Sequence, residues 1–369
     1  MLVVSGGWVQ RPLYGGHAWV FLNWLVGLQR LGFDVLFIDR TTPEMGVGTT
    51  SLAQFHSVMD RFGLANSYCI LGPGGKSAAG ISKASALAYL RRSLALLNFN
   101  GYLTDGALLD AAPVRVYVDI DPGFAQMWRE LGLHDSLSGH DLFVTIAENI
   151  GRSGCAIPTC GLNWITARQP VVLDLWPPRD ERVSAFTSVG SWRGPFAPIE
   201  FGNRIYGLRV HEFRKFVTLP RLTARPFTAA LDIHDNETAD LKILQDMGWH
   251  LVRPEQAVGN PFDYQDFIGQ SKAEFMVAKN MYVTTQCGWF SDRSSCYLAS
   301  GRPVIAQDTG LAGLYPVGTG LLTFESVDDA VAAVESVVSD YHRHARAARE
   351  IAESHFDSDY VLTSLLEKL

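Results

Sequence analysis

The stretch that decides the fold lies near the C-terminal end and reads Gly288-Trp289-Phe290-Ser291-Asp292-Arg293-Ser294-Ser295-Cys296-Tyr297-Leu298-Ala299-Ser300-Gly301-Arg302-Pro303-Val304-Ile305-Ala306-Gln307-Asp308-Thr309-Gly310. A glycine-bearing loop leads into a short helix that ends at Gly301, and Pro303 opens the strand that follows. A second polar loop then ends at Gly310. Backbone N–H groups at the start of a helix bind phosphate groups without a metal. The stretch therefore predicts a loop–helix–strand unit that binds a phosphate or a diphosphate.

The chain upstream of this stretch begins with a strand, a helix and a second strand. The apolar run Leu2–Ser5 predicts a buried strand, residues 17–31 an apolar helix, and residues 34–39 the next strand. Such a βαβ unit favours a parallel sheet, and hence the α/β class. The alternation continues, with helices expected at 51–62, 83–97, 328–339, 341–355 and 358–368, and strands at 68–71, 114–120, 142–147, 183–189, 227–232, 250–252, 281–285, 304–306 and 320–322.

A proline-rich segment divides this alternating pattern into two parts. Residues 168–182 contain Pro170, Pro177 and Pro178 among charges of both signs, which is typical of a hinge. A chain of 369 residues is long for one hydrophobic core and suits two domains. We therefore expect an N-terminal domain over residues 1–178 and a second domain over residues 179–350.

Composition argues against several classes of protein. Hydrophobic residues make up 47% of the chain and charged residues 19%, which are values of a globular protein. The net charge of -7 argues against a general nucleic-acid binder. Five cysteines without the spacing of a zinc site favour free thiols in a reducing cytoplasm. The apolar run at 18–28 is too short to span a membrane, so we expect a buried helix and a cytoplasmic protein.

The stretch 288–310 resembles the nucleotide-sugar donor site of GT-B Leloir glycosyltransferases, which also reads loop, helix, small-Gly-x-Pro-Val-Ile, loop. The resemblance implies two Rossmann-like domains facing each other across a cleft, with the C-terminal helix, here 351–369, packed back on the N-terminal domain. It implies that a nucleotide diphosphate sugar, a UDP- or TDP-sugar, binds mainly to the second domain as co-substrate. A hexose would pass to a hydroxyl of a natural-product-like small molecule or of a glycan bound to the first domain. No cofactor or metal is expected, and a homodimer is left open.

The paired glycines before the first helix carry a second resemblance. Gly15 and Gly16 let backbone N–H groups approach a ligand closely at the start of the helix. The sequence around Gly15 and Gly16 resembles the Gly-Gly loop that lies against the donor diphosphate in the retaining clan. It also resembles the Gly-His pair that supplies the catalytic base in the inverting natural-product clan. His17 is thus a candidate base for the acceptor hydroxyl, and the alternative is that it only caps the helix or fills the interface.

The second domain supplies most of the expected donor contacts. After the strand at 183–189 comes Gly190-Ser191-Trp192-Arg193, and in the retaining clan a glycine and a basic residue follow this strand. There the cation touches the donor phosphates, a role that Arg193 would take here. The loop after the strand at 250–252 is where the family binds the base. The resulting set of donor residues is Gly15, Gly16, Ser191, Arg193, Val252, Arg253, Gly288, Ser291, Asp292, Arg293, Ser294, Asp308, Thr309 and Gly310. The last three are expected to contact sugar hydroxyls.

Departures from the family pattern leave the stereochemistry and the activity open. The retaining clan carries Glu at the positions that align with Gly288 and Cys296. The His-Cys-Gly-Trp-Asn-Ser box of plant inverting enzymes has His and Asn where this chain has Gln286 and Phe290. A catalytically silent nucleotide-sugar binding module is one alternative, and a nucleotide-sugar 2-epimerase of the same fold is another. A Rossmann oxidoreductase fits less well, because no Gly-x-Gly-x-x-Gly follows the first strand.

An Asp-x-Asp pair ends the strand at 114–120. Asp119 and Asp121 have the spacing that holds a metal in single-domain transferases, but GT-B enzymes need no such metal. Asp121 followed by Pro122 predicts the N-cap and first position of a helix instead. Asp119 is kept as a second catalytic candidate, as a base or an acceptor contact.

Overall fold

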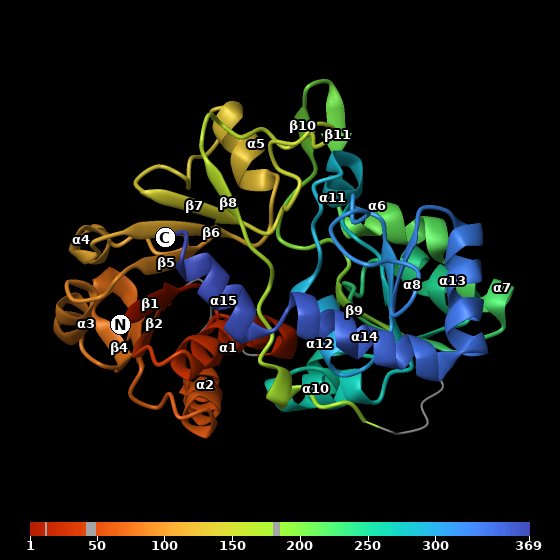
Figure 1. Ribbon diagram of the computed structural model, residues 1–369, viewed down its shortest axis with the longest axis horizontal. Coiled ribbons are helices and arrows are strands. Elements are labelled where there is room, and N and C mark those ends of the chain that lie inside the picture. The colour runs from red at the N-terminus through yellow and green to blue at the C-terminus, as the bar shows by residue number, and fades with distance from the viewer. Residues whose placement is uncertain (12, 42–48, 180–184) are drawn as a thin grey trace.

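The computed structural model describes residues 1–11, 13–41, 49–179 and 185–369, which form two α/β halves lying side by side (Figure 1). The first half is built on an eight-stranded sheet in the order β4-β3-β2-β1-β5-β6-β7-β8. The β3–β4 pair is antiparallel and the other neighbours are parallel. The strands are β1 (Leu2–Ser5), β2 (Val35–Arg40), β3 (Tyr68–Leu71), β4 (Ser77–Gly80), β5 (Leu96–Phe99), β6 (Arg115–Asp119), β7 (Leu142–Thr145) and β8 (Trp164–Thr166).

Helices connect these strands. The central one, α1, follows β1, is buried over most of its length and ends before Gly32, whose φ of +84° an L side chain rarely adopts. The helices of the first half are α1 (Gly15–Arg30), α2 (Thr49–Arg61), α3 (Lys83–Leu90), α4 (Gly106–Ala111) and α5 (Phe124–Glu130), with short 3₁₀ turns η2 (Pro73–Gly75) and η3 (Leu173–Leu175).

The second half is built on a six-stranded parallel sheet in the order β13-β12-β9-β14-β15-β16. Its strands are β9 (Phe186–Ser191), β12 (Phe227–Asp232), β13 (Trp249–Leu251), β14 (Ala273–Met276), β15 (Val304–Gln307) and β16 (Leu321–Phe324), and a separate hairpin joins β10 (Ile199–Phe201) to β11 (Arg204–Tyr206). The helices are α6 (Arg209–Phe213), η4 (Arg214–Phe216), α7 (Leu219–Thr223), α8 (Thr238–Asp246), α9 (Pro254–Ala257), α10 (Pro261–Gly269), α11 (Asn280–Thr285), α12 (Asp292–Ala299), α13 (Val327–Ser339) and α14 (Tyr341–His355).

Both sheets reverse their strand order at a central strand. In the first sheet β1 lies between β2 and β5, and in the second β9 lies between β12 and β14. All four residues of β1 are buried, as expected of a parallel strand covered on both faces. Ligands of open α/β sheets bind outside the carboxyl ends of the strands at such a reversal. The topology therefore predicts a ligand-binding site among the loops after β1, β5, β6, β9, β12 and β14.

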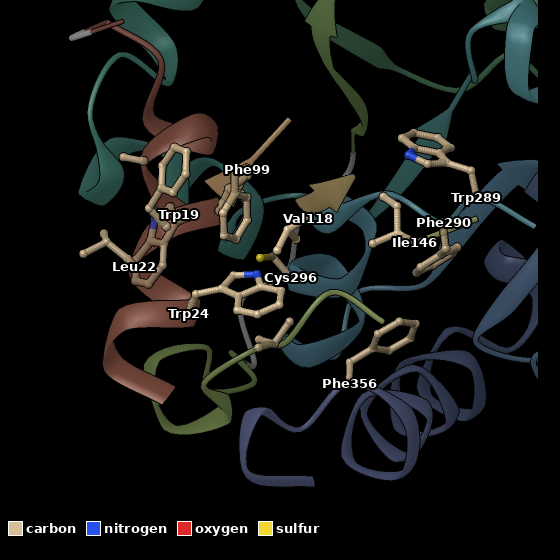
Figure 2. Packing of buried hydrophobic residues seen from close by; sticks show 14 of the residues in the cluster. Trp19, Leu22, Trp24, Phe99, Val118, Ile146, Trp289, Phe290, Cys296 and Phe356 are labelled. Carbon is tan, nitrogen blue, oxygen red and sulfur yellow. The ribbon is translucent and has the colours of Figure 1, made fainter. Parts of the chain in front are cut away.

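One hydrophobic core runs through the interface between the halves. Figure 2 shows Trp19 and Trp24 of α1 in the same packed cluster as Cys296 of α12 and Phe290. The Trp19 indole N–H donates to the backbone oxygen of Pro261 in the second half at 2.7 Å. The two halves consequently share buried surface in addition to the cleft between them.

The C-terminal segment returns to the first half. After α14 the chain turns at Phe356 and forms α15 (Ser358–Leu366), which packs against α1 and ends beside the first sheet (Figure 1). Gly27 of α1 lies at the contact, where a Cβ would stand 2.6 Å from a Leu362 methyl carbon. Two Rossmann-like halves and a C-terminal helix that crosses back are the predicted fold class, which is confirmed.

Several predicted elements differ from the observed ones. The helix expected at 83–97 stops at Leu90, and residues 96–99 form the central strand β5. The strand expected at 281–285 is the helix α11. The strand expected at 183–189 is observed as β9 from Phe186, and residues 183 and 184, like 180–182 of the expected hinge, lie outside the described residues. Short apolar runs fit a buried helix and a buried strand equally well, which explains the second error.

No helix in the described part of the chain has both the length and the apolar character needed to cross a membrane.

Candidate functional site

A cavity of about 400 Å³ lies between the carboxyl ends of the two sheets. Its first wall comes from the loops after β1, β5 and β6 and from the start of α1. Its second wall comes from β9 and the loops after β9, β12 and β14, and from the starts of α6 and α12. The residues used below are His17, Phe21, Phe99, Ile120 and Asp121 on the first wall and Arg193, Phe196, Arg209, Asp232, Lys279 and Arg293 on the second.

The glycine pair at the start of α1 brings the two walls together. A Cβ on Gly15 would stand 2.2 Å from the Asn260 carbonyl oxygen, and one on Gly16 would stand 2.7 Å from the Tyr264 ring. The Gly15 N–H donates to the Val258 carbonyl at 3.0 Å. The pair lines the cavity, but its small size is required first by the close approach of α10.

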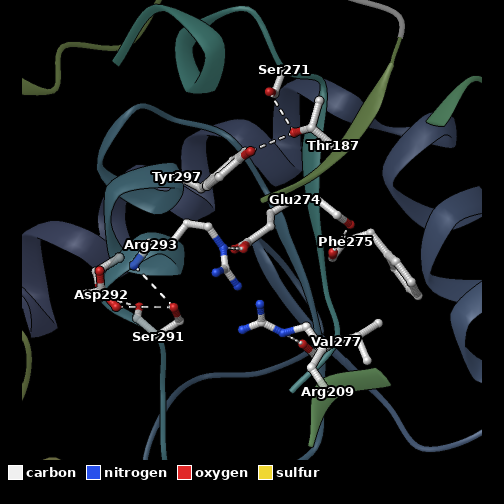
Figure 3. Close-up of polar contacts among 12 residues, drawn as sticks. Thr187, Arg209, Ser271, Glu274, Phe275, Val277, Ser291, Asp292, Arg293 and Tyr297 are labelled. Atoms are coloured by element: carbon white, nitrogen blue, oxygen red, sulfur yellow. Dashed lines mark hydrogen bonds and ion pairs between the residues drawn. The ribbon is translucent and has the colours of Figure 1, made fainter. Parts of the chain in front are cut away.

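Two arginine side chains of the second wall lie close together. Figure 3 shows the guanidinium groups of Arg209 and Arg293 facing each other. Arg293 forms an ion pair with the buried carboxylate of Glu274. Arg209 instead donates to two backbone oxygens, of Val277 at 3.0 Å and of Ser191 at 3.1 Å. No described carboxylate forms an ion pair with Arg209, although the more distant Glu274 and Asp121 act on its charge.

The electrostatics of the two arginines differ accordingly. Burial, and then the charge of Arg293, lower the pKa of Arg209 to about 10. Burial also disfavours the charge of Arg293, but Glu274 outweighs it and the pKa of Arg293 is raised. Both side chains stay charged at neutral pH. Buried like charges repel, and an anion that accepts hydrogen bonds from both relieves that repulsion.

Gly190 makes room for Arg209. A Cβ at Gly190 would stand 1.8 Å from Nη1 of Arg209, so any other residue would block the guanidinium. Gly190 lies within β9, and its small size lets Arg209 reach the cavity from α6.

His17 lines the first wall and is neutral. Its Nε2 lies 2.6 Å from the Gly7 carbonyl oxygen, and because a carbonyl only accepts, Nε2 carries the proton. Nδ1 is then the unprotonated nitrogen. Burial, followed by the charge of Arg11, lowers the pKa of His17 to about 4, against the opposing effect of the Gly7 hydrogen bond. At neutral pH the ring has a free lone pair for a proton.

The Asp-x-Asp pair is split between two environments. Asp121 reaches the cavity, where both its oxygens accept from Nζ of Lys279, at 2.7 and 2.6 Å, and Tyr282 also donates to it. The expected helix cap at Asp121 is wrong, because the N-cap of α5 is Gly123, two residues later. The side chain of Asp121 instead bridges the two halves.

Asp119 lies behind the wall and not on it. It is 1% exposed and accepts from Gln126 at 2.7 Å and from Thr145 at 2.9 Å. Burial raises its pKa to about 6, although these hydrogen bonds oppose the rise. A carboxylate enclosed in this way holds the end of β6 in place. The geometry does not fit the predicted role of Asp119 as a base or acceptor contact.

The predicted donor residues separate into two sets. Those that line the cavity are Gly15, Gly16, Ser191, Arg193, Asp292 and Arg293. Arg193 is exposed and paired with Glu237. Those that lie outside the lining are Val252, Arg253, Gly288, Ser291, Ser294, Asp308, Thr309 and Gly310.

The residues of the second set are engaged within the protein. The Gly288 N–H donates to the Thr309 carbonyl at 2.7 Å, and Asp308 accepts from the N–H of Gly310 at 3.2 Å. Ser291 caps α12, and Arg253 pairs with Asp235 on the surface. The loop at Gly288 therefore packs against Asn149 of the first half. Asp292 and Arg293, at the start of α12, line the cavity instead.

Sequence reasoning missed three residues of this site. Arg209 follows a hairpin, Lys279 precedes a helix that was taken for a strand, and Tyr282 belongs to that helix. None of them stands in a recognisable motif. Only an indirect feature of the sequence could have indicated them. Charged residues that follow the strands of a parallel sheet tend to meet at the same edge of that sheet.

No group of three or more His, Cys, Asp or Glu side chains suited to a metal ion occurs within residues 1–11, 13–41, 49–179 and 185–369.

Comparison with known proteins agrees with this architecture. No protein-family model and no curated protein sequence matches the chain. It is similar to the structure of Anabaena HepE in complex with UDP and glucose, with a TM-score of 0.61 and 12% identity over 100% of this chain and 98% of that one. It is also similar to an alpha-glucosyltransferase in complex with UDP and a 13-mer DNA, with a TM-score of 0.60 and 12% identity over 99% and 98% of the two chains.

A third similar structure is the sucrose-phosphate synthase of Thermosynechococcus elongatus, with a TM-score of 0.52 and 11% identity over 99% of this chain and 97% of that one. These proteins are glycosyltransferases, and the similarity extends over nearly the whole length of each chain. The fold of this chain is the GT-B fold of nucleotide-sugar glycosyltransferases.

Proposed function

We propose that this protein is a glycosyltransferase that moves a hexose from a nucleoside diphosphate sugar, and specifically a UDP-sugar, to a hydroxyl group. The observation that carries the proposal is the pair of buried guanidiniums, Arg209 and Arg293, at the carboxyl ends of the second sheet. A diphosphate supplies the negative charge and the several acceptor oxygens that such a pair lacks. Two of the similar structures hold UDP, which favours that nucleotide.

The two arginines would act on the leaving group. In the transfer step the bond between the anomeric carbon and the diphosphate oxygen breaks, and both electrons stay with the diphosphate. Positive charge fixed beside that oxygen stabilises the charge that develops in the transition state. Lys279 lines the same cavity and adds a third cation, although Asp121 holds it in this structure. These side chains supply what a metal ion supplies in other transferases, so we propose a metal-independent reaction.

His17 would act on the acceptor. As the acceptor oxygen bonds to the anomeric carbon, its proton passes to Nδ1 of His17, the nitrogen left free by the contact with Gly7. The low pKa of His17 keeps the ring neutral and ready to accept at neutral pH. This role belongs to an inverting reaction. In a retaining reaction the leaving phosphate can take the proton, and His17 would then only position the sugar.

The donor proposal is tested by calorimetry with UDP, TDP, GDP and ADP. We expect UDP to bind most tightly, and we expect binding to weaken strongly in Arg209→Gln. Arg225→Gln is the matched control, because Arg225 forms an exposed ion pair with Glu335 away from the cavity. Absence of binding by all four nucleotides would refute the proposal.

A further inference from the structure

The first wall of the cavity differs in chemistry from the second. It presents the side chains of Val20, Phe21, Phe99 and Ile120, and Phe196 faces the same space from the second half. Phe21 and Phe99 are 1% and 2% exposed, so their rings form the back of the wall and not its rim. The acceptor side of the cavity is consequently aliphatic and aromatic.

Most polar side chains on this wall are already hydrogen bonded within the protein. The Gln10 amide donates to the Arg40 carbonyl at 2.8 Å, and the Tyr102 hydroxyl donates to the same oxygen at 3.1 Å. The Asn100 side-chain oxygen accepts from the Ile120 N–H at 3.1 Å. The Gln10 amide N–H, the Tyr102 O–H and the Asn100 side-chain oxygen are therefore already engaged within the protein.

Of the remaining polar groups, Tyr14 and Asp121 bridge the two halves, and the exposed Arg11 also lines the cavity. The Tyr14 hydroxyl donates to Asp232 at 2.9 Å, and Asp121 is held by Lys279 and Tyr282. Nδ1 of His17 is the group on this wall that the hydrogen bonds leave as an acceptor. A ligand with a single hydroxyl finds a partner there, and the apolar side chains of this wall offer none for further hydroxyls.

We propose that the acceptor is a compact, mainly apolar alcohol, aromatic or alicyclic, with one reactive hydroxyl, and not a sugar chain. This proposal rests on the proposed glycosyl transfer. The acceptor oxygen forms the bond to the anomeric carbon, its proton goes to Nδ1 of His17, and the diphosphate leaves with the electrons of the broken bond. The part of the acceptor that enters the cavity has to share its volume of about 400 Å³ with the donor sugar.

The test is equilibrium binding of 2-naphthol and of methyl α-glucopyranoside to the full chain, free and loaded with UDP. We expect 2-naphthol to bind and methyl α-glucopyranoside to bind at least roughly tenfold more weakly. Ile120→Ser and Phe196→Ser each place a polar group on the wall and should weaken naphthol binding by roughly tenfold, without changing the Kd of UDP. Thermal unfolding checks that each variant is folded.

The matched control is Ile205→Ser, because Ile205 is 65% exposed on β11 and does not line the cavity. Tighter binding of the methyl glucoside, no binding of 2-naphthol, or an equal loss in the control would overturn the proposal. Failure of UDP to bind would instead refute the proposed donor, and the measurements on the free protein would still decide the acceptor class.

Discussion

The two walls of the cavity differ in how their polar groups are satisfied. On the second wall Arg209 is buried with hydrogen bonds to backbone oxygens and without a carboxylate partner among the described residues. On the first wall Gln10, Tyr102 and Asn100 bond to backbone groups, and much of the surface left over is apolar. A wall with unneutralised charge is suited to an anion, and a wall with satisfied polar groups is suited to an apolar molecule. With the proposed function, this difference favours the donor on the second half and the acceptor on the first.

The largest effect is expected on the first wall, at His17. His17→Ala should lower kcat by roughly 10²–10⁴-fold, the usual scale of general base catalysis, because no other neutral base lies at that position. The Kd of UDP should change little, since the second wall binds the diphosphate. Steady-state kinetics and calorimetry measure the two quantities, with the exposed His342→Ala as control.

If His17→Ala keeps its activity, the stereochemistry of the product shows which role of His17 is excluded. An inverted anomeric centre, seen by NMR, together with a fully active His17→Ala enzyme would remove His17 as the base. A retained centre together with weaker donor binding in the mutant would give His17 a positioning role.

The second effect is expected on the other wall. Arg209→Gln should weaken UDP binding by roughly 10–100-fold, because a hydrogen bond between charged groups contributes about 1.5–3 kcal/mol. The affinity for 2-naphthol should stay the same. If Arg209→Gln weakens the binding of both UDP and 2-naphthol, the two walls do not bind their ligands independently, which contradicts the proposed difference between them.

The pH dependence sharpens the comparison further. The pKa of His17 is lowered to about 4, so the ring stays neutral well below the ordinary value for histidine. Activity should therefore persist as the pH falls through 6.5 and drop only near pH 4, roughly tenfold for each further unit. The measurement is kcat against pH at saturating donor, with the Kd of UDP followed in parallel. A drop centred near pH 6.5 would show that the titrating base is not a buried His17.

The smallest effect is expected from metal removal. EDTA should leave kcat unchanged, because Lys279 and Tyr282 occupy the oxygens of Asp121 and Asp119 is enclosed behind the wall. Turnover before and after chelation is the measurement. Loss of activity with EDTA and recovery with manganese would mean that the Asp-x-Asp pair binds a metal during the reaction.

Much of the fold could be predicted from the sequence, because local patterns determine it. The apolar run at 2–5, the buried helix before Gly32 and the next strand form the βαβ unit that was expected. The errors occurred where a short apolar run fits both a buried helix and a buried strand. The predicted helix at 83–97 ran into the strand β5 at 96–99, and Phe99 at the end of that strand lines the cavity.

The site was less predictable, because distant contacts determine it. Arg293 was expected from its place in the motif, and it does line the cavity. Its partner Arg209 comes from a helix that follows a hairpin, and nothing in the sequence relates the two side chains. Asp121 was read as a local cap because the residue that binds it, Lys279, is 158 positions away. Local sequence chemistry cannot anticipate an ion pair between two sheets.

The two segments that connect the halves are joined to each other. The Val171 N–H donates to the Phe356 carbonyl at 2.7 Å, and the Ser358 N–H donates to the Val171 carbonyl at 2.9 Å. Two connections tied in this way can bend together, but they resist twisting and sliding past one another. The halves are therefore expected to part by rotation about a single axis. Each wall then stays at a high effective concentration with respect to the other, and closing over a bound donor loses less orientational freedom than it would on one flexible linker.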